Sequence, residues 1–214
     1  MHIFAHLVCT AALGFVALLW ILLGIDLALG VPSMPSLAKY SPLPDGRCPT
    51  VSVLFGARDE AEKLPAALQT FLSLDYPSYE VIAVDDRSED ATGAILAHAA
   101  QRDSRVHRVR VDSLPAGWLG KPHALQTAYE NSTGEWLVFT DADVHFAPDL
   151  LRRTAALAET KRWDHLTLLG HPKMFTLGEK IAMTFFASRS SAARGPTRPA
   201  TLAQAGTPAW ARFS

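Results

Sequence analysis

The stretch "GEWLVFTDADVHFAPD", residues 134–149, joins an apolar run to a pair of aspartates. Residues 136–140 are apolar or carry a hydroxyl, which is typical of a buried strand. The run ends at Asp141 and Asp143, which a single alanine separates. Two carboxylates at a strand tip repel each other unless a cation or hydrogen-bond donors stabilise them. The stretch therefore predicts a strand that delivers acidic side chains to its carboxyl end.

Segments typical of strands and of helices alternate on both sides of this stretch. The predicted strands are residues 50–55, 79–84, 105–111, 136–140 and 165–170. The predicted helices are residues 64–74, 89–102 (capped by Ser88), 121–131 and 148–161. This order implies an α/β fold whose mostly parallel sheet has helices on both faces.

The residues that directly follow the predicted strands are rich in carboxylates. The first strand is followed by Arg58, Asp59 and Glu60, the second by Asp85 and Asp86, and the fourth by Asp141 and Asp143. In a parallel sheet these strand ends meet along one edge, where ligands collect. The loop that contains Lys121 also reaches this edge, and a lysine at a helix start favours anion binding.

A divalent metal explains this gathering of carboxylates. Mg²⁺ takes one or two protein carboxylates and completes its coordination with water and substrate phosphate oxygens. A lone D-x-D is more often a solvated turn, because aspartate is a common turn residue. Three acidic strand ends in one sheet instead favour a metal that holds a diphosphate.

An uncharged apolar segment, "LVCTAALGFVALLWILLGI", occupies residues 7–25. Its nineteen residues come close to the roughly 20 that cross a bilayer as a helix. A signal peptide fits less well, since no basic cluster precedes the segment and no cleavage site follows. A buried core helix is the plainer alternative, but nineteen apolar residues without a polar face fit it poorly. Lys39 and Arg47 follow the segment and none precedes it, which favours a cytoplasmic remainder and a single-pass inner-membrane protein.

These signals divide the chain into four expected parts. Residues 1–30 form a transmembrane helix, and residues 31–49, with five prolines, form an extended linker. Residues 50–175 form the α/β domain, and residues 176–214 form an interfacial or poorly ordered tail.

Composition excludes several classes of protein. The net charge of −1 and the lack of a basic stripe argue against a nucleic-acid partner. The two cysteines, Cys9 and Cys48, are too few for a disulfide framework or a zinc site. No G-x-G-x-x-G follows the first strand, where "GARDEA" stands instead, so a dinucleotide-binding Rossmann protein is rejected.

Four motifs resemble those of the family 2 inverting glycosyltransferases with the GT-A fold. They are "VSVLFGARDE", "DYPSYEVIAVDDRSEDAT", "GWLGKPHAL" and "GEWLVFTDADVHFAPDLL". The resemblance runs from about residue 49 to residue 170. The third motif further resembles a membrane-associated bacterial branch, including hopanoid-associated and carotenoid glycosyltransferases, that acts on lipid or polyisoprenoid acceptors.

The resemblance implies a role for each matching residue. A nucleotide-sugar donor, a UDP-sugar by preference, would lie along Ala57, Arg58 and Glu60, with its base and ribose on Asp86 and Asp85. Lys121 would approach the nucleotide or diphosphate. Asp141 and Asp143 would be the D-x-D motif, with Asp143 the favoured ligand of Mg²⁺ or Mn²⁺. The sugar would pass with inversion to a lipid or polyisoprenoid acceptor at the membrane.

The sequence departs from the family pattern in three ways. Gly56 stands where many members have proline, a change expected to be tolerated. No ED pair, the usual place of the catalytic base, follows Gly170, so the base is unassigned and Glu179 is the nearest later carboxylate. Further transmembrane helices are not found either. These departures suggest the hypothesis of a truncated copy that binds a nucleotide sugar with impaired turnover.

Two other functions remain for comparison. Nucleotidyl transfer on a related fold is disfavoured, because no glycine-rich phosphate loop follows the first strand. A membrane-tethered binder of nucleotide sugars without activity is the non-enzyme alternative.

Overall fold

The computed structural model describes residues 2–33, 35–168 and 176–179. Residues 37–163 form one compact unit, and the long helix α1 (His2–Ser33) lies outside it. The two parts are therefore described separately.

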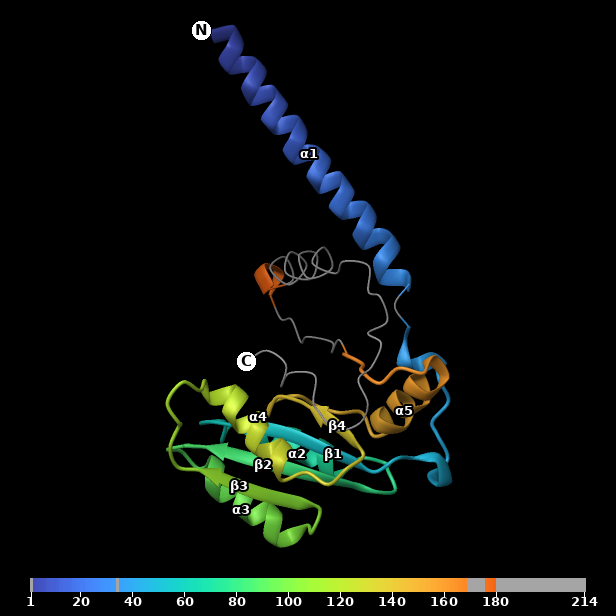
Figure 1. Cartoon of the computed structure of the whole chain (residues 1–214), viewed down its shortest axis with the longest axis vertical. Coiled ribbons are helices and arrows are strands. Elements are labelled where there is room, and N and C mark those ends of the chain that lie inside the picture. The colour runs from blue at the N-terminus through green and yellow to red at the C-terminus, as the bar shows by residue number, and fades with distance from the viewer. Residues whose placement is uncertain (1, 34, 169–175, 180–214) are drawn as a thin grey trace. The chain divides into compact units, whose positions relative to one another are not determined.

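The compact unit is built on a four-stranded sheet (Figure 1). Its strands are β1 (Val51–Ala57), β2 (Tyr79–Asp86), β3 (Val106–Val111) and β4 (Trp136–Phe139). The order is β3-β2-β1-β4, and every neighbouring pair is parallel. The predicted parallel sheet is confirmed, and the strand ends that carry the acidic residues share one edge.

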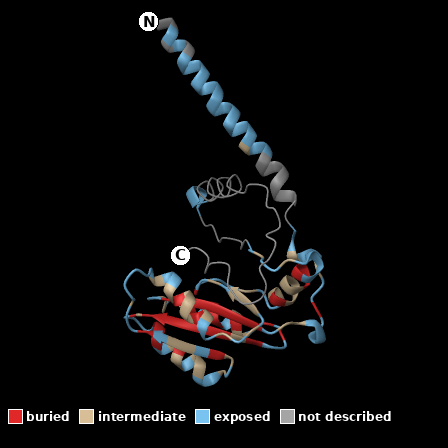
Figure 2. Ribbon diagram, in the orientation of Figure 1, coloured by how far each residue is buried: buried red, intermediate tan, exposed pale blue. Residues whose placement is uncertain are grey.

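Helices cover both faces of this sheet, as expected. They are α2 (Leu64–Leu72), α3 (Thr92–Arg102), α4 (Gly120–Glu130) and α5 (Leu150–Lys161). Side chains of β1 alternate between two cores. Val53 and Phe55 pack with residues of α2, α3 and α5, whereas Leu54 packs with Ala124 and other residues of α4. The buried central strands are visible in Figure 2. Because both faces are covered, polar chemistry is confined to the sheet's edges.

Helix α4 lies very close to the end of β1. A Cβ atom at Gly56 would stand 2.8 Å from the Cβ of Ala124. Ala124 of α4 therefore occupies the space that a side chain at position 56 would need. Any larger residue at position 56, proline included, would meet the same obstacle.

The segment of residues 31–49 differs from the extended linker expected. Helix α1 continues to Ser33, and two short 3₁₀ helices follow, η1 (Leu37–Lys39) and η2 (Asp45–Arg47). Leu43 is buried, and its carbonyl accepts a 2.7 Å hydrogen bond from Arg152 of α5. Residues 37–49 are thus part of the compact unit, held by a residue more than a hundred positions later in the chain.

Two smaller expectations also changed. Ser88 does not cap α3, because the helix begins at Thr92 and Ser88 lies in the preceding loop. The strand expected at residues 165–170 is absent from residues 165–168, and residues 169–170 lie outside the described residues. Most of the tail, residues 180–214, also lies outside them.

Helix α1 contains a stretch suited to a membrane. Val8–Ile25 has a mean hydropathy of 2.5, and none of it is buried. Within the described residues it is the one helix of sufficient length and apolarity to span a bilayer, although an N-terminal signal sequence has the same properties.

We expect Gly56→Ala to destabilise the compact unit by about 1–3 kcal/mol, because the added methyl group overpacks the contact with Ala124. Urea unfolding of the full chain in detergent measures the change. Gly46→Ala is the matched control, since a Cβ there meets nothing within 4 Å. Equal stability of the two variants would contradict this account of α4.

A second prediction concerns acid stability and Glu80. Its Oε1 accepts hydrogen bonds from Ser52 (2.5 Å) and from the backbone and hydroxyl of Thr133 (2.6 and 2.9 Å). Burial alone raises the pKa of Glu80, but these hydrogen bonds outweigh it and the pKa falls below its ordinary value of 4.5. The ionised form therefore stabilises the fold above that value, and the contribution is lost as pH falls through the lowered pKa.

Glu80→Gln should accordingly be less stable than the wild type at pH 7, with a gap that narrows by about pH 3. Urea unfolding of both proteins across this range provides the test. Glu62→Gln changes an exposed side chain and should follow the wild type throughout. A gap that stays constant with pH would refute the assignment.

Candidate functional site

The ends of β1 and β2, the turn after β4 and the start of α4 surround one cavity of about 520 Å³. Every residue predicted to bind nucleotide or metal lines it except Asp85. The lining residues are Gly56, Ala57, Arg58, Glu60, Asp86, Gly120, Lys121, Ala124, Asp141 and Asp143. Four segments far apart in the sequence therefore meet at one polar site, as the parallel sheet requires.

The two aspartates after β4 are presented by a turn whose middle residue is buried. Ala142 is 4% exposed and belongs to the core beside α2, whereas the side chains of Asp141 and Asp143 are 55% and 41% exposed. Farther along, Phe146 packs against Phe71 with ring centroids 4.8 Å apart. The alanine and the phenylalanine thus anchor the turn, and both carboxylates remain available at the cavity.

Each of these carboxylates is paired with a lysine from another segment. The Nζ of Lys121 lies 2.5 Å from Oδ1 of Asp141, and the Nζ of Lys63 lies 3.4 Å from Oδ2 of Asp143. Lys63, directly before α2, was missed by the sequence analysis. Its position three residues after Glu60 in "GARDEAEK" would have been a signal, because that loop was already expected at the site.

Asp86 lies against the cavity with its carboxylate held in a fork. Arg87 donates from Nε to Oδ1 at 2.8 Å and from Nη2 to Oδ2 at 3.2 Å. The hydrogen bond to Asp86 raises the pKa of the Arg87 guanidinium. Arg87 adopts a left-handed backbone with φ of 59°, and Asp59 does likewise with φ of 54°. Such residues cost on the order of 1–3 kcal/mol each and cluster at functional sites.

Asp85 has different surroundings from those expected. Its side chain is fully buried and is not among the residues that line the cavity. Oδ2 accepts hydrogen bonds from Arg108 (3.2 Å) and Arg110 (3.0 Å) of β3, and Oδ1 accepts one from the Ser88 N–H (3.2 Å). Loss of either arginine would leave the buried Asp85 charge less compensated, although both guanidinium groups are partly exposed to solvent. Asp85 therefore joins β3 to the loop after β2 beside the cavity and does not itself line the cavity.

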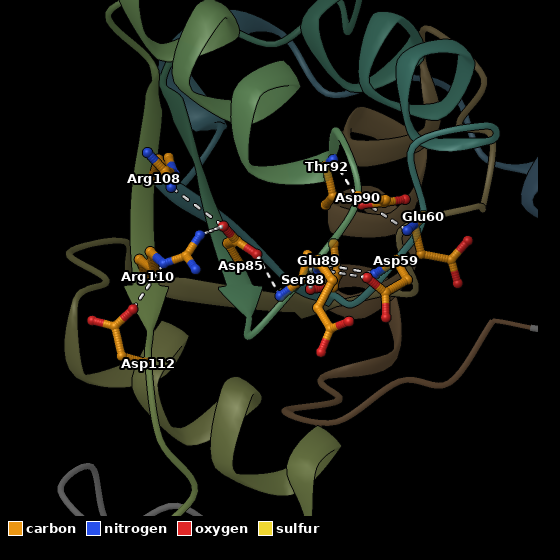
Figure 3. A network of polar contacts seen from close by, with 11 residues as sticks. Asp59, Glu60, Asp85, Ser88, Glu89, Asp90, Thr92, Arg108, Arg110 and Asp112 are labelled. Atoms are coloured by element: carbon orange, nitrogen blue, oxygen red, sulfur yellow. Dashed lines mark hydrogen bonds and ion pairs between the residues drawn. The ribbon is translucent and has the colours of Figure 1, made fainter.

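The loop after β1 is bonded to the loop after β2 (Figure 3). Asp59 donates its N–H to the Ser88 hydroxyl at 3.2 Å, and its carboxylate accepts the N–H of Glu89 at 2.8 Å. Glu60 donates its N–H to the Thr92 hydroxyl at 2.9 Å. These bonds fix the backbone at Asp59 and Glu60, directly after Arg58 at the cavity wall.

The donor atoms at the cavity suit a hard cation. Asp141 and Asp143 offer carboxylate oxygens, the ligand type that Mg²⁺ and Mn²⁺ prefer. Among the described residues no group of three or more His, Cys, Asp or Glu side chains is placed to hold a metal. Two carboxylates therefore fit an ion whose remaining ligands are water and phosphate oxygens.

Glu179, the nearest later carboxylate, takes part in a helix start. It accepts the N–H of Thr176 at 3.1 Å, and its own N–H donates to the Thr176 hydroxyl at 3.2 Å. This reciprocal pair is a capping box. The local contacts of Glu179 are thus those of a helix cap.

Comparison with known proteins gives a family and several relatives. The sequence profile described as "Glycosyl transferase family 2" matches residues 52–167, more than half of the chain. The chain is 32% identical over 147 residues to beta-monoglucosyldiacylglycerol synthase of Trichormus variabilis, covering 66% of this chain and 31% of that protein. It is 28% identical over 144 residues to undecaprenyl-phosphate 4-deoxy-4-formamido-L-arabinose transferase of Enterobacter, covering 66% and 40%. The chain thus spans less than half the length of these relatives.

A solved structure is also similar to this chain. It is the mannosyltransferase PcManGT of Pyrobaculum calidifontis, in complex with GDP-Man and Mn²⁺. The identity is 29%, the TM-score is 0.48, and the match covers 66% of this chain and 39% of that one.

The lysine pairs lead to a prediction about metal affinity. Lys63 competes with a cation for Asp143, so Lys63→Gln should raise the affinity for Mn²⁺ alone, by up to about fivefold for an exposed pair. The free Mn²⁺ signal in electron paramagnetic resonance reports the binding. Lys39→Gln, far from the cavity in sequence and not among its lining residues, should leave it unchanged. Weaker Mn²⁺ binding in Lys63→Gln would refute the competition.

Proposed function

This chain belongs to the family 2 glycosyl transferases, and we propose that it transfers a sugar from a nucleotide-diphosphate sugar to a lipid or polyisoprenoid acceptor, with inversion and with a divalent metal. A UDP-sugar is the favoured donor. The observation that carries the proposal is the meeting of Asp86, Lys121, Asp141 and Asp143 in one cavity at the carboxyl ends of parallel strands.

The cavity offers different chemistry to the two ends of such a donor. Asp86 accepts hydrogen bonds from the base or the ribose hydroxyls, in place of or together with Arg87. Ala57, Arg58 and Glu60 lie along the nucleotide on the neighbouring wall. Lys121, at the start of α4, meets the negative charge of the diphosphate, where a helix start adds further attraction for anions.

Asp143, with Asp141, would hold Mg²⁺ or Mn²⁺. When bound, the metal neutralises charge on the departing nucleoside diphosphate. Lys121 and Lys63, which pair with these carboxylates in the structure, would then be available to contact the phosphate oxygens. Both lysines are exposed enough to move, with side chains 66% and 61% exposed.

In the proposed reaction an acceptor hydroxyl forms a bond to the anomeric carbon on the face opposite the diphosphate. The bond from that carbon to the diphosphate oxygen breaks, the electron pair leaves with the nucleoside diphosphate, and the hydroxyl proton passes to a base. This displacement inverts the anomeric carbon. The base is left unassigned.

A membrane-associated acceptor is supported by two features. Helix α1 has the length and apolarity of a membrane span. The names of two relatives refer to a diacylglycerol product and an undecaprenyl-phosphate substrate. We place the chain in the inner membrane by a single span with the compact unit in the cytoplasm.

Binding of UDP in the presence of Mn²⁺ tests the donor site, measured by calorimetry on the full chain in detergent. Asp143→Asn should weaken this binding at least about tenfold, through the lost metal ligand. Asp45→Asn removes an exposed aspartate outside the cavity and should bind normally. UDP affinity that is the same with and without Mn²⁺, and the same in Asp143→Asn as in the wild type, would overturn the proposed site.

Turnover separates the enzyme from the non-enzyme alternative. Incubation with UDP-sugars, Mn²⁺ and a membrane lipid extract should release free UDP and yield a glycosylated lipid. Binding of UDP without release of UDP from any donor would instead favour an impaired nucleotide-sugar binder.

A further inference from the structure

We propose that Asp85, Arg108 and Arg110 form a positioning network that sets the donor affinity of the cavity from outside it. The inference rests on the proposed function, because it names which residues control donor binding at that site. None of the three lines the cavity. They act through the loops that follow β1 and β2, beside the lining residues Arg58, Glu60 and Asp86.

The two oxygens of Asp85 divide their hydrogen bonds between two directions. Oδ2 binds both arginines of β3, and Oδ1 binds the Ser88 N–H in the loop toward the cavity. Arg108 and Arg110 are two residues apart in a strand, so both reach the same face of the sheet (Figure 3). The carboxylate is therefore a junction between the edge strand and the loop after β2.

The network continues from that loop to the loop after β1. The Ser88 hydroxyl accepts the Asp59 N–H, and the Asp59 carboxylate accepts the Glu89 N–H. Arg58 and Glu60, which line the cavity, are the direct neighbours of Asp59. Hydrogen bonds at Asp85, Ser88 and Asp59 thus connect Arg110 to the direct chain neighbours of Arg58 and Glu60.

The junction leaves Asp85 no freedom to find other partners. Its side chain is 0% exposed. A Cβ atom at Gly93, in the first turn of α3, would stand 2.5 Å from Oδ2. Helix α3 therefore closes directly over the carboxylate. If an arginine is lost, the charge stays buried without full compensation, and the Ser88 loop must shift to relieve it.

The expected effect is on donor binding more than on turnover. The loops in the network carry the nucleotide side of the cavity, whereas the turn with Asp141 and Asp143 follows β4 and is anchored separately by Phe146. Loosening the network should raise KM for the donor and leave kcat nearly unchanged. A purely structural role would instead reduce the folded fraction and lower kcat at constant KM.

Arg110→Gln tests the network, because Arg110 is its most exposed member, with a side chain 45% exposed, and the variant should fold. Arg105→Gln is the matched control. Arg105 directly precedes β3, at the end away from the cavity, and it binds Asp103 at 2.6 Å, the Tyr79 hydroxyl and the Leu72 carbonyl, so its loss removes at least as many contacts without touching the network. Both variants should lose thermal stability.

Two readouts are compared in the full chain in detergent. Calorimetry with UDP and Mn²⁺ should show affinity lowered about tenfold in Arg110→Gln and unchanged in Arg105→Gln. Amide hydrogen exchange without ligand should be faster at Ser88 and Asp59 in Arg110→Gln alone. Wild-type affinity in Arg110→Gln, or an equal loss in Arg105→Gln, would overturn the proposal.

The exchange measurement separates this proposal from the proposed function. If the wild type binds no UDP, the donor site fails. Faster exchange at Ser88 and Asp59 in Arg110→Gln would then still support the network, and unchanged exchange would refute it as well.

Discussion

The common direction of the four strands is the constraint on which the rest of this structure depends. Parallel strands end at one edge, and each connection must return through a helix that covers a face. The interior of β1 and β2 is mostly apolar, and Asp85 and Asp86 stand where β2 finishes, whereas Glu80 near the start of β2 is held by Ser52 and Thr133. The cavity is a consequence of this topology. It gathers side chains that the sequence separates by more than eighty residues.

Charge compensation then shapes that edge. Three of the four carboxylates that line the cavity, those of Asp86, Asp141 and Asp143, would repel one another if left alone. Each instead meets a cation of this chain: Arg87 at Asp86, Lys121 at Asp141 and Lys63 at Asp143. The pairs differ in strength. The fork at Asp86 is largely buried and geometrically fixed, whereas the lysine pairs are exposed and held weakly. The Asp86 side of the cavity, proposed to bind the nucleoside, is thus held rigidly. The Asp141 and Asp143 side, proposed to bind the metal and diphosphate, has side chains that can move.

Much of this arrangement was predictable from sequence, because periodicity and strand ends are local signals. The four parallel strands, the helices and the cluster of site residues followed from them. The predictions that failed depended on contacts between residues that are far apart in the sequence. Leu43 is buried because Arg152 reaches it, and Ser88 bonds Asp85 and Asp59 in place of a helix. The roles of Asp85 and Asp86 were also not separable, since adjacent strand residues face opposite sides and sequence does not say which side is open.

Asp59 and Arg87 adopt a left-handed backbone, which favours glycine, but their side chains make contacts beside the cavity that glycine cannot make. Glycine at either position would relieve the backbone, since it has no Cβ to crowd the carbonyl. Yet glycine would also delete the carboxylate that joins the two loops or the guanidinium that grips Asp86. A variant with glycine at either position would gain backbone freedom and lose the contacts that hold the two loops and Asp86 in place beside the cavity.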